Sequence, residues 1–241
     1  MVISGKINQL QPKSLSGIPH VGEVLIRESC VMIQAGIRSI LAQYAFHDEC
    51  CLGVSTIHDM PLMMATHKVA LIIMELNGKG ESVFDSLRMI DYLRRGWPSI
   101  PLIVCTALTD PRILKQLLAL EVNNIYFKQD LLSTFSLHIL RAFCPSMKNE
   151  MGISPHSISL LRDDDVLLVL SKREITVLEC LLAGNSVTRV AQLLKRDVRT
   201  VSSQKRSAML KLGLRNDYAL YSWGSELALQ GRFWAKDSGY E

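Results

Sequence analysis

Four polar side chains near the carboxyl end have the types and spacing needed to read a nucleic acid: Arg199, Ser202, Ser203 and Arg206. An α-helix turns by about 100° per residue, so the four fall on one side of a helix. A guanidinium can bond bidentately to guanine, and a serine hydroxyl can bond to several base edges. The pattern predicts a helix that lies in the major groove of duplex DNA. The alternative is an ordinary surface helix with a solvated polar face.

The other side of the same helix is apolar and is expected to be packed. Lys205 falls beside this apolar arc, so we expect its ammonium to extend outward toward a phosphate while its stem stays with the apolar residues. The apolar arc holds Val198, Val201, Ala208, Met209 and Leu212.

Start and stop signals predict four helices over 169–230. Ser171 and Glu174 have the spacing of a capping box, which predicts a first helix from Lys172 to about Ala183, ending at Gly184. Asp197 is placed to cap the third helix, and Asn216 the fourth. Two helices joined by a tight turn, the second of them basic, are typical of a helix-turn-helix. The second to fourth predicted helices span 187–194, 198–212 and about 217–229.

Charge is concentrated in this part of the chain. Leu170 to Arg215 holds ten basic and three acidic residues, a net charge of +7, whereas the whole chain carries +4 and the remainder therefore −3. A basic block beside a slightly acidic body is an electrostatic footprint for a polyanion. On charge alone, a solvated surface explains the block equally well.

The first half alternates short apolar runs with longer amphipathic stretches. Parallel neighbouring strands need crossover helices, so this alternation predicts an α/β fold: a doubly wound five-stranded parallel sheet, followed by the all-α helix-turn-helix domain. Functional side chains in such a sheet gather at the carboxyl ends of its strands. The expected strands are 24–26, 52–54, 69–74, 102–105 and 124–127, and the expected helices are 33–41, 59–67, 83–95, a segment after Pro111, and 131–143.

Composition excludes several classes of protein. With 48% apolar and 21% charged residues, the 241-residue chain is neither disordered nor fibrous. Its six cysteines show no C-x-x-C spacing, so we expect no metal site and a reducing, cytoplasmic location. No leader-like or membrane-spanning run is evident. Neither a glycine-rich phosphate loop nor a nucleophile elbow occurs, so we expect no enzyme activity and no cofactor.

The run from Leu170 to Leu214 resembles the LuxR/NarL-type DNA-binding domain, and the part from Val201 to Gly213 is similar to the RcsB/BglJ branch of that family. The resemblance implies that the third helix reads the major groove and that the fourth supports dimerisation. The matching positions are Leu170-Ser171, Arg173-Glu174, Val177-Leu178, Gly184, Ala191, Thr200-Val201 and Lys211-Leu212-Gly213.

This resemblance assigns roles residue by residue. Ser202, Ser203 and Arg206 become candidates for reading bases. The candidates for phosphate contacts are Arg199, Thr200 and Lys205. Tyr218, Leu220 and Tyr221 lie on the helix that the family uses for dimerisation.

The first half resembles a response-regulator receiver domain whose phosphoacceptor pocket is degenerate. A working receiver holds magnesium with two acids after the first strand and accepts phosphate on an Asp after the third. It uses a hydroxyl after the fourth strand and a lysine after the fifth. The aligned residues here are Glu28, Ser29, Glu75, Thr106 and Lys128.

Two departures change the chemistry. Glu75 in place of Asp moves the carboxylate one methylene away from the position for in-line transfer. Ser29 removes an anionic oxygen that magnesium prefers. Ile125 stands where many receivers carry an aromatic switch. We therefore expect a pseudo-receiver in which Glu75 and Lys128 form a salt bridge. A vestigial polar cluster without activity is the alternative.

Taken together, these patterns predict five segments: an N-terminal extension (1–20), the pseudo-receiver (21–144), a linker with one short helix (145–168), the DNA-binding domain (169–230) and a tail (231–241). The expected function is transcription regulation without aspartyl phosphorylation, as a homodimer or as a heterodimer with an RcsB-like regulator on double-stranded DNA. The alternative is an interaction protein that sequesters a related regulator without reading DNA. A ligand-gated sensor of the quorum-sensing type fits less well, because aromatic residues make up only 6% of the chain.

Overall fold

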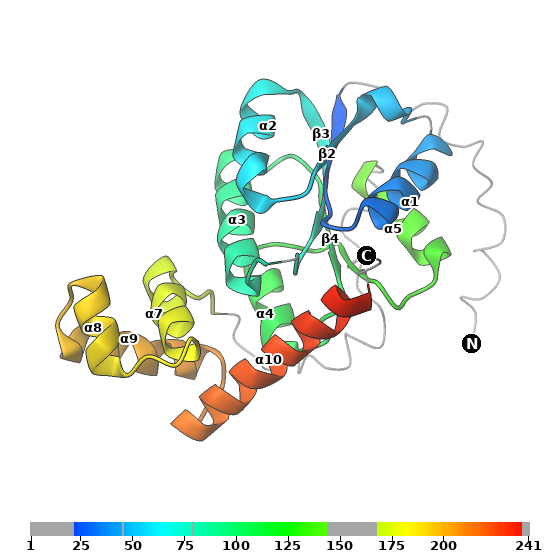
Figure 1. Ribbon diagram of the computed structural model, residues 1–241. Coiled ribbons are helices and arrows are strands. Elements are labelled where there is room, and N and C mark those ends of the chain that lie inside the picture. The colour runs from blue at the N-terminus through cyan, green and yellow to red at the C-terminus, as the bar shows by residue number, and fades with distance from the viewer. Residues whose placement is uncertain (1–21, 45, 79, 144–167, 238–241) are drawn as a thin grey trace, which may run out of the picture.

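The computed structural model describes residues 22–44, 46–78, 80–143 and 168–237 (Figure 1). The first half is a five-stranded, entirely parallel sheet in the order β2-β1-β3-β4-β5. This confirms the predicted doubly wound α/β fold. The strands are β1 (Glu23–Arg27), β2 (Cys51–Val54), β3 (Val69–Glu75), β4 (Leu102–Thr106) and β5 (Ile125–Phe127).

Helices cover both faces of the sheet. The face with α1 (Val31–Ala42) and α5 (Leu132–Phe143) lies opposite the face with α2 (Met60–Thr66), α3 (Val83–Gly96) and α4 (Pro111–Ala119) (Figure 1). Because both faces are covered, the central strands are apolar on both sides, and their polar neighbours are confined to the strand ends. Two short 3-10 turns, η3 (Asp48–Cys50) and η4 (Ile57–Asp59), flank β2.

The second half is all helical, as predicted, with α7 (Lys172–Leu182), α8 (Val187–Leu194), α9 (Val198–Lys211) and α10 (Asp217–Asp237). The capping box of Ser171 is present. The fourth helix extends beyond its predicted end, yet neither it nor another helix in the described ranges is long and apolar enough to cross a membrane. The predicted linker helix and the N-terminal extension lie outside the described residues.

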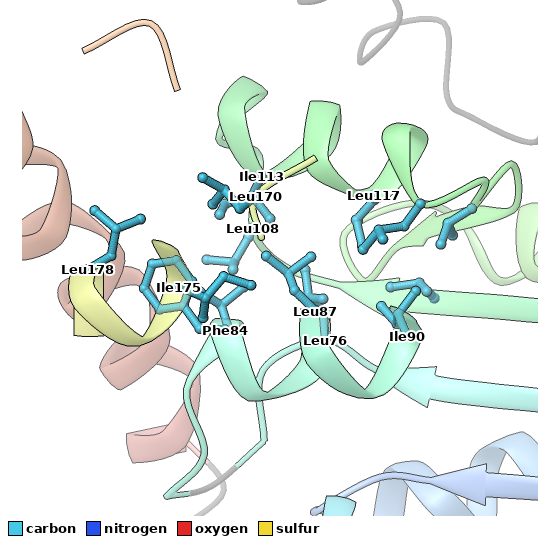
Figure 2. Packing of buried hydrophobic residues seen from close by; sticks show 14 of the residues in the cluster. Leu76, Phe84, Leu87, Ile90, Leu108, Ile113, Leu117, Leu170, Ile175 and Leu178 are labelled. Atoms are coloured by element: carbon cyan, nitrogen blue, oxygen red, sulfur yellow. The ribbon is translucent and has the colours of Figure 1, made fainter. Parts of the chain in front are cut away.

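Apolar packing joins the two halves. Figure 2 shows Phe84 and Leu87 of α3 and Leu108 of the β4–α4 loop lying close to Leu170 and Ile175 at the start of the helical domain. All five side chains are buried and belong to one continuous cluster. The helical domain is therefore packed against the side of the receiver half formed by α3 and α4.

Polar contacts fix the same junction. Arg88 of α3 donates hydrogen bonds to both carboxylate oxygens of Glu179 of α7. Trp223 of α10 donates from Nε1 to Oδ2 of Asp110, the residue that caps α4, over 3.1 Å. The Gln116 amide donates to the Leu168 carbonyl and accepts from the Leu170 amide, each over 2.8 Å. The chain is thus held where it enters the helical domain.

Gly224 lies where α10 passes α7. A Cβ at this position would collide with the side chain of Leu182. Glycine therefore allows the two helices to approach closely, which explains a residue of low helix propensity in the middle of a helix.

Candidate nucleic-acid interface and carboxylate pocket

Helix α9 presents a polar face to solvent. Arg199, Thr200, Ser203 and Arg206 are exposed, and Ser202 is half-buried. Asp197 caps the helix by accepting a hydrogen bond from the Arg199 amide over 2.7 Å, which sets where the exposed face begins. The structure thus brings these five predicted side chains together on one accessible surface.

The apolar arc of α9 is packed, with one exception. Val201, Ala208, Met209 and Leu212 are buried. Val198 is 43% exposed, so its predicted burial is wrong. It is the first residue of the helix and lies almost one turn before Val201, the first residue of α9 that reaches the core.

Lys205 also differs from expectation. Its ammonium donates to Oδ2 of Asp217 over 2.6 Å, and the residue is only 8% exposed. Asp217 starts α10, so the ion pair ties the third helix of the domain to the fourth. The expectation of an outward-directed ammonium overlooked this partner twelve residues away.

Glu174 holds α9 in place against α7. It accepts hydrogen bonds from Ser207 Oγ over 2.5 Å and from Lys211 Nζ over 2.7 Å. Burial alone would raise the pKa of this carboxyl, but hydrogen bonds from Lys211, Ser207 and Ser171 lower it to about 2. The sequence indicated only the capping role of Glu174. Its second role, clamping the candidate reading helix, depends on contacts more than thirty residues away.

Of the three residues predicted on the dimerisation helix, two are accessible. Tyr218 is 83% exposed and Tyr221 is 40% exposed, whereas Leu220 is fully buried. Leu220 therefore packs inside its own domain, and the tyrosines form the outward face of the first turns of α10.

The second candidate site lies at the carboxyl edge of the sheet, where four of the five predicted pocket residues meet. Lys128 Nζ lies 2.5 Å from Glu75 Oε1 and 3.0 Å from Glu28 Oε2, so the expected salt bridge is present with a second carboxylate added. Ser29 Oγ donates to Glu75 Oε2 over 2.9 Å. Thr106 instead accepts from the Leu108 amide over 2.9 Å, within the β4–α4 loop.

The pKa values of the two carboxyl groups are shifted in opposite directions. Burial and the neighbouring Glu75 carboxylate raise the pKa of Glu28, and Lys128 only partly offsets this. Burial would also raise the pKa of Glu75, but Lys128 and the hydrogen bond from Ser29 lower it below its usual value. Burial would lower the pKa of Lys128, whereas the two carboxylates raise it. The cluster consequently holds one ammonium between two acids, of which Glu28 is the less readily ionised.

A fourth charged group, Arg27, was not anticipated from the sequence. Its guanidinium is fully buried, and Nη1 donates to the backbone carbonyl of Glu75 over 2.7 Å. Nη2 pairs with Glu81, whose other carboxylate oxygen accepts from the Ile57 amide over 2.7 Å. Arg27 ends a strand that is otherwise apolar, so the only signal was a charge inside an apolar run. The guanidinium links β1 to the loop after β3.

We expect Gly78→Ala to destabilise the fold, because a Cβ on Gly78 would collide with the Arg27 guanidinium. Displacing this buried cation from its acceptors should lower the free energy of unfolding by about 1–3 kcal/mol, measured by urea denaturation. Gly96→Ala is the matched control: Gly96 ends α3, and its Cβ would enter open space. Equal stability of the two variants would contradict this role of Gly78.

Comparisons with known proteins show the family of this chain. The profile of the luxR family of bacterial regulatory proteins matches residues 168–223, which include α7, α8 and α9. The transcriptional regulatory protein RcsB of Escherichia coli K12 is 31% identical over 218 residues, covering 86% of this chain and 95% of RcsB. The chain belongs to the RcsB family. Its helix-turn-helix is of the LuxR type, as the sequence predicted.

Solved RcsB structures share the fold. RcsB of Salmonella enterica serovar Typhimurium bound to promoter rprA, in the presence of a phosphomimetic, matches with a TM-score of 0.61 and 27% identity, covering 85% of this chain and 98% of RcsB. The same protein bound to promoter P1flhDC matches with a TM-score of 0.57 and 28% identity, covering 86% of this chain and 99% of RcsB. The likeness thus extends over both domains of RcsB.

Compared with a working receiver, the pocket of this RcsB relative does not fit magnesium. Lys128 donates hydrogen bonds to both carboxylates that would face the ion, those of Glu28 and Glu75. Arg27 donates to the backbone carbonyl of Glu75. Ser29 supplies a hydroxyl that donates to Glu75 where the resemblance expects a second acid. Magnesium requires oxygen ligands in near-octahedral geometry, and here the two carboxylates are instead oriented toward Lys128 and Ser29.

Proposed function

We propose that this chain regulates transcription by binding duplex DNA through α9. The observation that carries the proposal is the exposed face of Arg199, Thr200, Ser203 and Arg206 on a helix clamped by Glu174. The net charge of +7 over Leu170–Arg215 supplies the attraction to phosphates. Relatives whose structures are described as RcsB bound to promoters support it. No catalytic step is part of the proposal.

The proposed active form is a dimer, either of two copies or with a related regulator. The exposed Tyr218 and Tyr221 on α10 offer a face for such pairing. One related structure is described as two RcsB dimers bound to two parallel DNAs. Two-fold symmetry then places two half-sites about 10 base pairs apart.

The test is Arg206→Ala, with Arg173→Ala as the matched control. Both arginines are exposed and both changes remove one positive charge, but Arg173 lies on α7, away from the proposed reading face. Using promoter fragments recovered by genomic footprinting of this chain, we expect Arg206→Ala to weaken binding by about tenfold to a hundredfold in a gel shift. Arg173→Ala should change it by less than about threefold. Unchanged binding by Arg206→Ala would refute the assignment of α9.

We further propose that DNA binding is independent of aspartyl phosphorylation. Supporting this, the Glu75 carboxylate is held by Lys128 and Ser29, and it lies one methylene from the position of an acceptor Asp. After incubation with acetyl phosphate and magnesium, intact-mass measurement should show no adduct, and the gel shift should be unchanged. An adduct that Glu75→Gln abolishes would overturn this part of the proposal.

Salt dependence separates this function from the alternative, an interaction protein that sequesters a related regulator. DNA binding through several phosphates weakens steeply as salt rises, whereas an apolar heterodimer does not. A steep slope on DNA supports the proposal. The sequestration alternative would be favoured by two results together. This chain would assemble with a related regulator to an extent that does not change with salt, and neither the pair nor this chain alone would bind DNA.

A further inference from the structure

A cavity of about 600 Å³ opens between α1 and α5, on the side of the carboxylate pocket that faces these two helices. Its walls are mainly apolar, and its mouth includes Ile33 and Leu132, which are both exposed. The volume is in the range of small-molecule sites, which typically combine apolar walls with a few converging polar groups. The apolar walls are formed by Ile33, Ile37, Ile40, Leu132 and Phe135.

The inner end of the cavity is polar and carries excess negative charge. Glu28 and Glu75 share the ammonium of Lys128, and the Arg27 guanidinium pairs with the carboxylates of both Glu81 and Glu75. Among these five side chains, three carboxylates are shared by two cations, so the group carries one negative charge in excess when all five are ionised. Burial, and to a smaller extent the nearby Glu75 carboxylate, raise the pKa of Glu28. A positively charged group entering the cavity would relieve the excess negative charge.

A glycine lies on the wall of the cavity. Gly36 lies in α1 between Ile33 and Ile40, about one turn from each, on the wall of the cavity. Among the residues that the structure describes, no atom lies within 4 Å of the place where its Cβ would be. Glycine in the middle of a helix is unfavourable relative to alanine, so its presence here is not explained by helix stability. Gly36 is exposed, and a longer side chain at this position would extend into the open space at the wall of the cavity.

We propose that this cavity binds a small amphipathic molecule, with a cationic amine head at Glu28 and Glu75 and an apolar body between α1 and α5. The two carboxylates are only 2% and 9% exposed, so a slender head group can reach them and the flat surface of a second protein cannot. The inference does not depend on DNA binding. In this proposal, the bound molecule is the regulatory ligand of the pseudo-receiver and takes the place of the phosphoryl group.

The first test uses three probes of equal chain length: octylammonium, octanol and octanoate. Binding to the full-length chain is measured by isothermal titration calorimetry in the absence of DNA. We expect octylammonium to bind, and octanoate to bind at least about tenfold more weakly, because its charge repeats that of the carboxylates. Octanoate binding as tightly as octylammonium, or no binding by any probe at millimolar concentration, would overturn the proposal.

Two variants locate the binding. Gly36→Leu should fill the cavity and abolish octylammonium binding, while its thermal midpoint stays at or above that of the unmodified chain, because leucine favours the helix. Gly96→Leu adds the same side chain in open space at the end of α3 and should leave binding unchanged. Glu28→Gln should weaken octylammonium but not octanol. If Gly36→Leu instead weakens self-association in sedimentation and leaves probe binding intact, a second copy occupies the groove and the small-molecule proposal fails.

Discussion

Lys128→Met should lower the free energy of unfolding by about 3–5 kcal/mol near neutral pH, because it removes the cation from two buried carboxylates. Glu28 and Glu75 lie on the same ammonium at 3.0 and 2.5 Å, and without it they repel each other at the carboxyl edge of the sheet. Methionine keeps the length and the apolar stem of lysine, so the packing around β5 is retained. Urea denaturation followed by circular dichroism measures the change.

The loss should depend on pH in a defined direction. The lowered pKa of Glu75 means that its carboxylate stabilises the fold above the pKa of the unfolded chain, and that this contribution is lost as the pH falls. The raised pKa of Glu28 means that its ionisation opposes folding at neutral pH. Removing Lys128 raises the pKa values of both Glu28 and Glu75. The loss in the free energy of unfolding should therefore be largest at about pH 8 and should shrink toward about pH 5.

A second substitution tests the cause. Adding Glu28→Gln to Lys128→Met removes the repulsion and should recover part of the lost stability. The introduced amide oxygen can still accept from the Cys30 amide, as the Glu28 carboxylate does over 3.0 Å. Glu28→Gln alone should be neutral or slightly stabilising. If the stability loss of Lys128→Met does not vary with pH, its cause is lost packing rather than the repulsion between the two buried carboxylates.

Trp223→Ala should have an effect of similar size, lowering the free energy of unfolding by about 3–5 kcal/mol. Trp223 is 2% exposed, and its ring meets Phe84 edge-on with centroids 6.1 Å apart. Its removal leaves a cavity shared by the two halves of the molecule, and it frees Asp110 from the hydrogen bond with Nε1. The loss should appear in urea denaturation, with earlier unfolding of the helical domain.

Trp223→Phe separates the ring from the hydrogen bond. Phenylalanine keeps most of the contact with Phe84 but cannot donate to Asp110, so we expect a loss of about 1 kcal/mol. If Trp223→Ala were no more destabilising than Trp223→Phe, the tryptophan ring would not be part of the junction core.

The sequence predicts features that depend on near neighbours in the chain. Apolar runs such as Leu71–Met74 indicated the strands, and the capping box of Ser171 and Glu174 indicated the start of α7. The phosphoacceptor positions came from the receiver resemblance and could be placed because strand ends of a parallel sheet meet at one edge. Side chains that follow different strands were therefore expected to converge at that edge, and four of the five do.

Features that depend on distant partners were missed. Lys205 was expected to point outward, but Asp217, which begins the next helix, holds it. Arg27 was overlooked because a charge within a strand has no periodic signature and its acceptor Glu81 lies 54 residues away. The contact of Trp223 with Asp110 spans 113 residues and joins two domains that the sequence describes separately. Such pairs are set by tertiary packing, which no local pattern encodes.

The proposed reading face of α9 is exposed while the helical domain is docked on α3 and α4. In proteins whose binding surface is hidden in the resting state, only a small fraction of the molecules is open, and the apparent affinity is reduced in proportion to that fraction. In the described residues of the first half, no segment covers the proposed reading face, so we expect no such penalty from them. We therefore expect a signal that acts on this protein to change its pairing or orientation rather than to uncover α9.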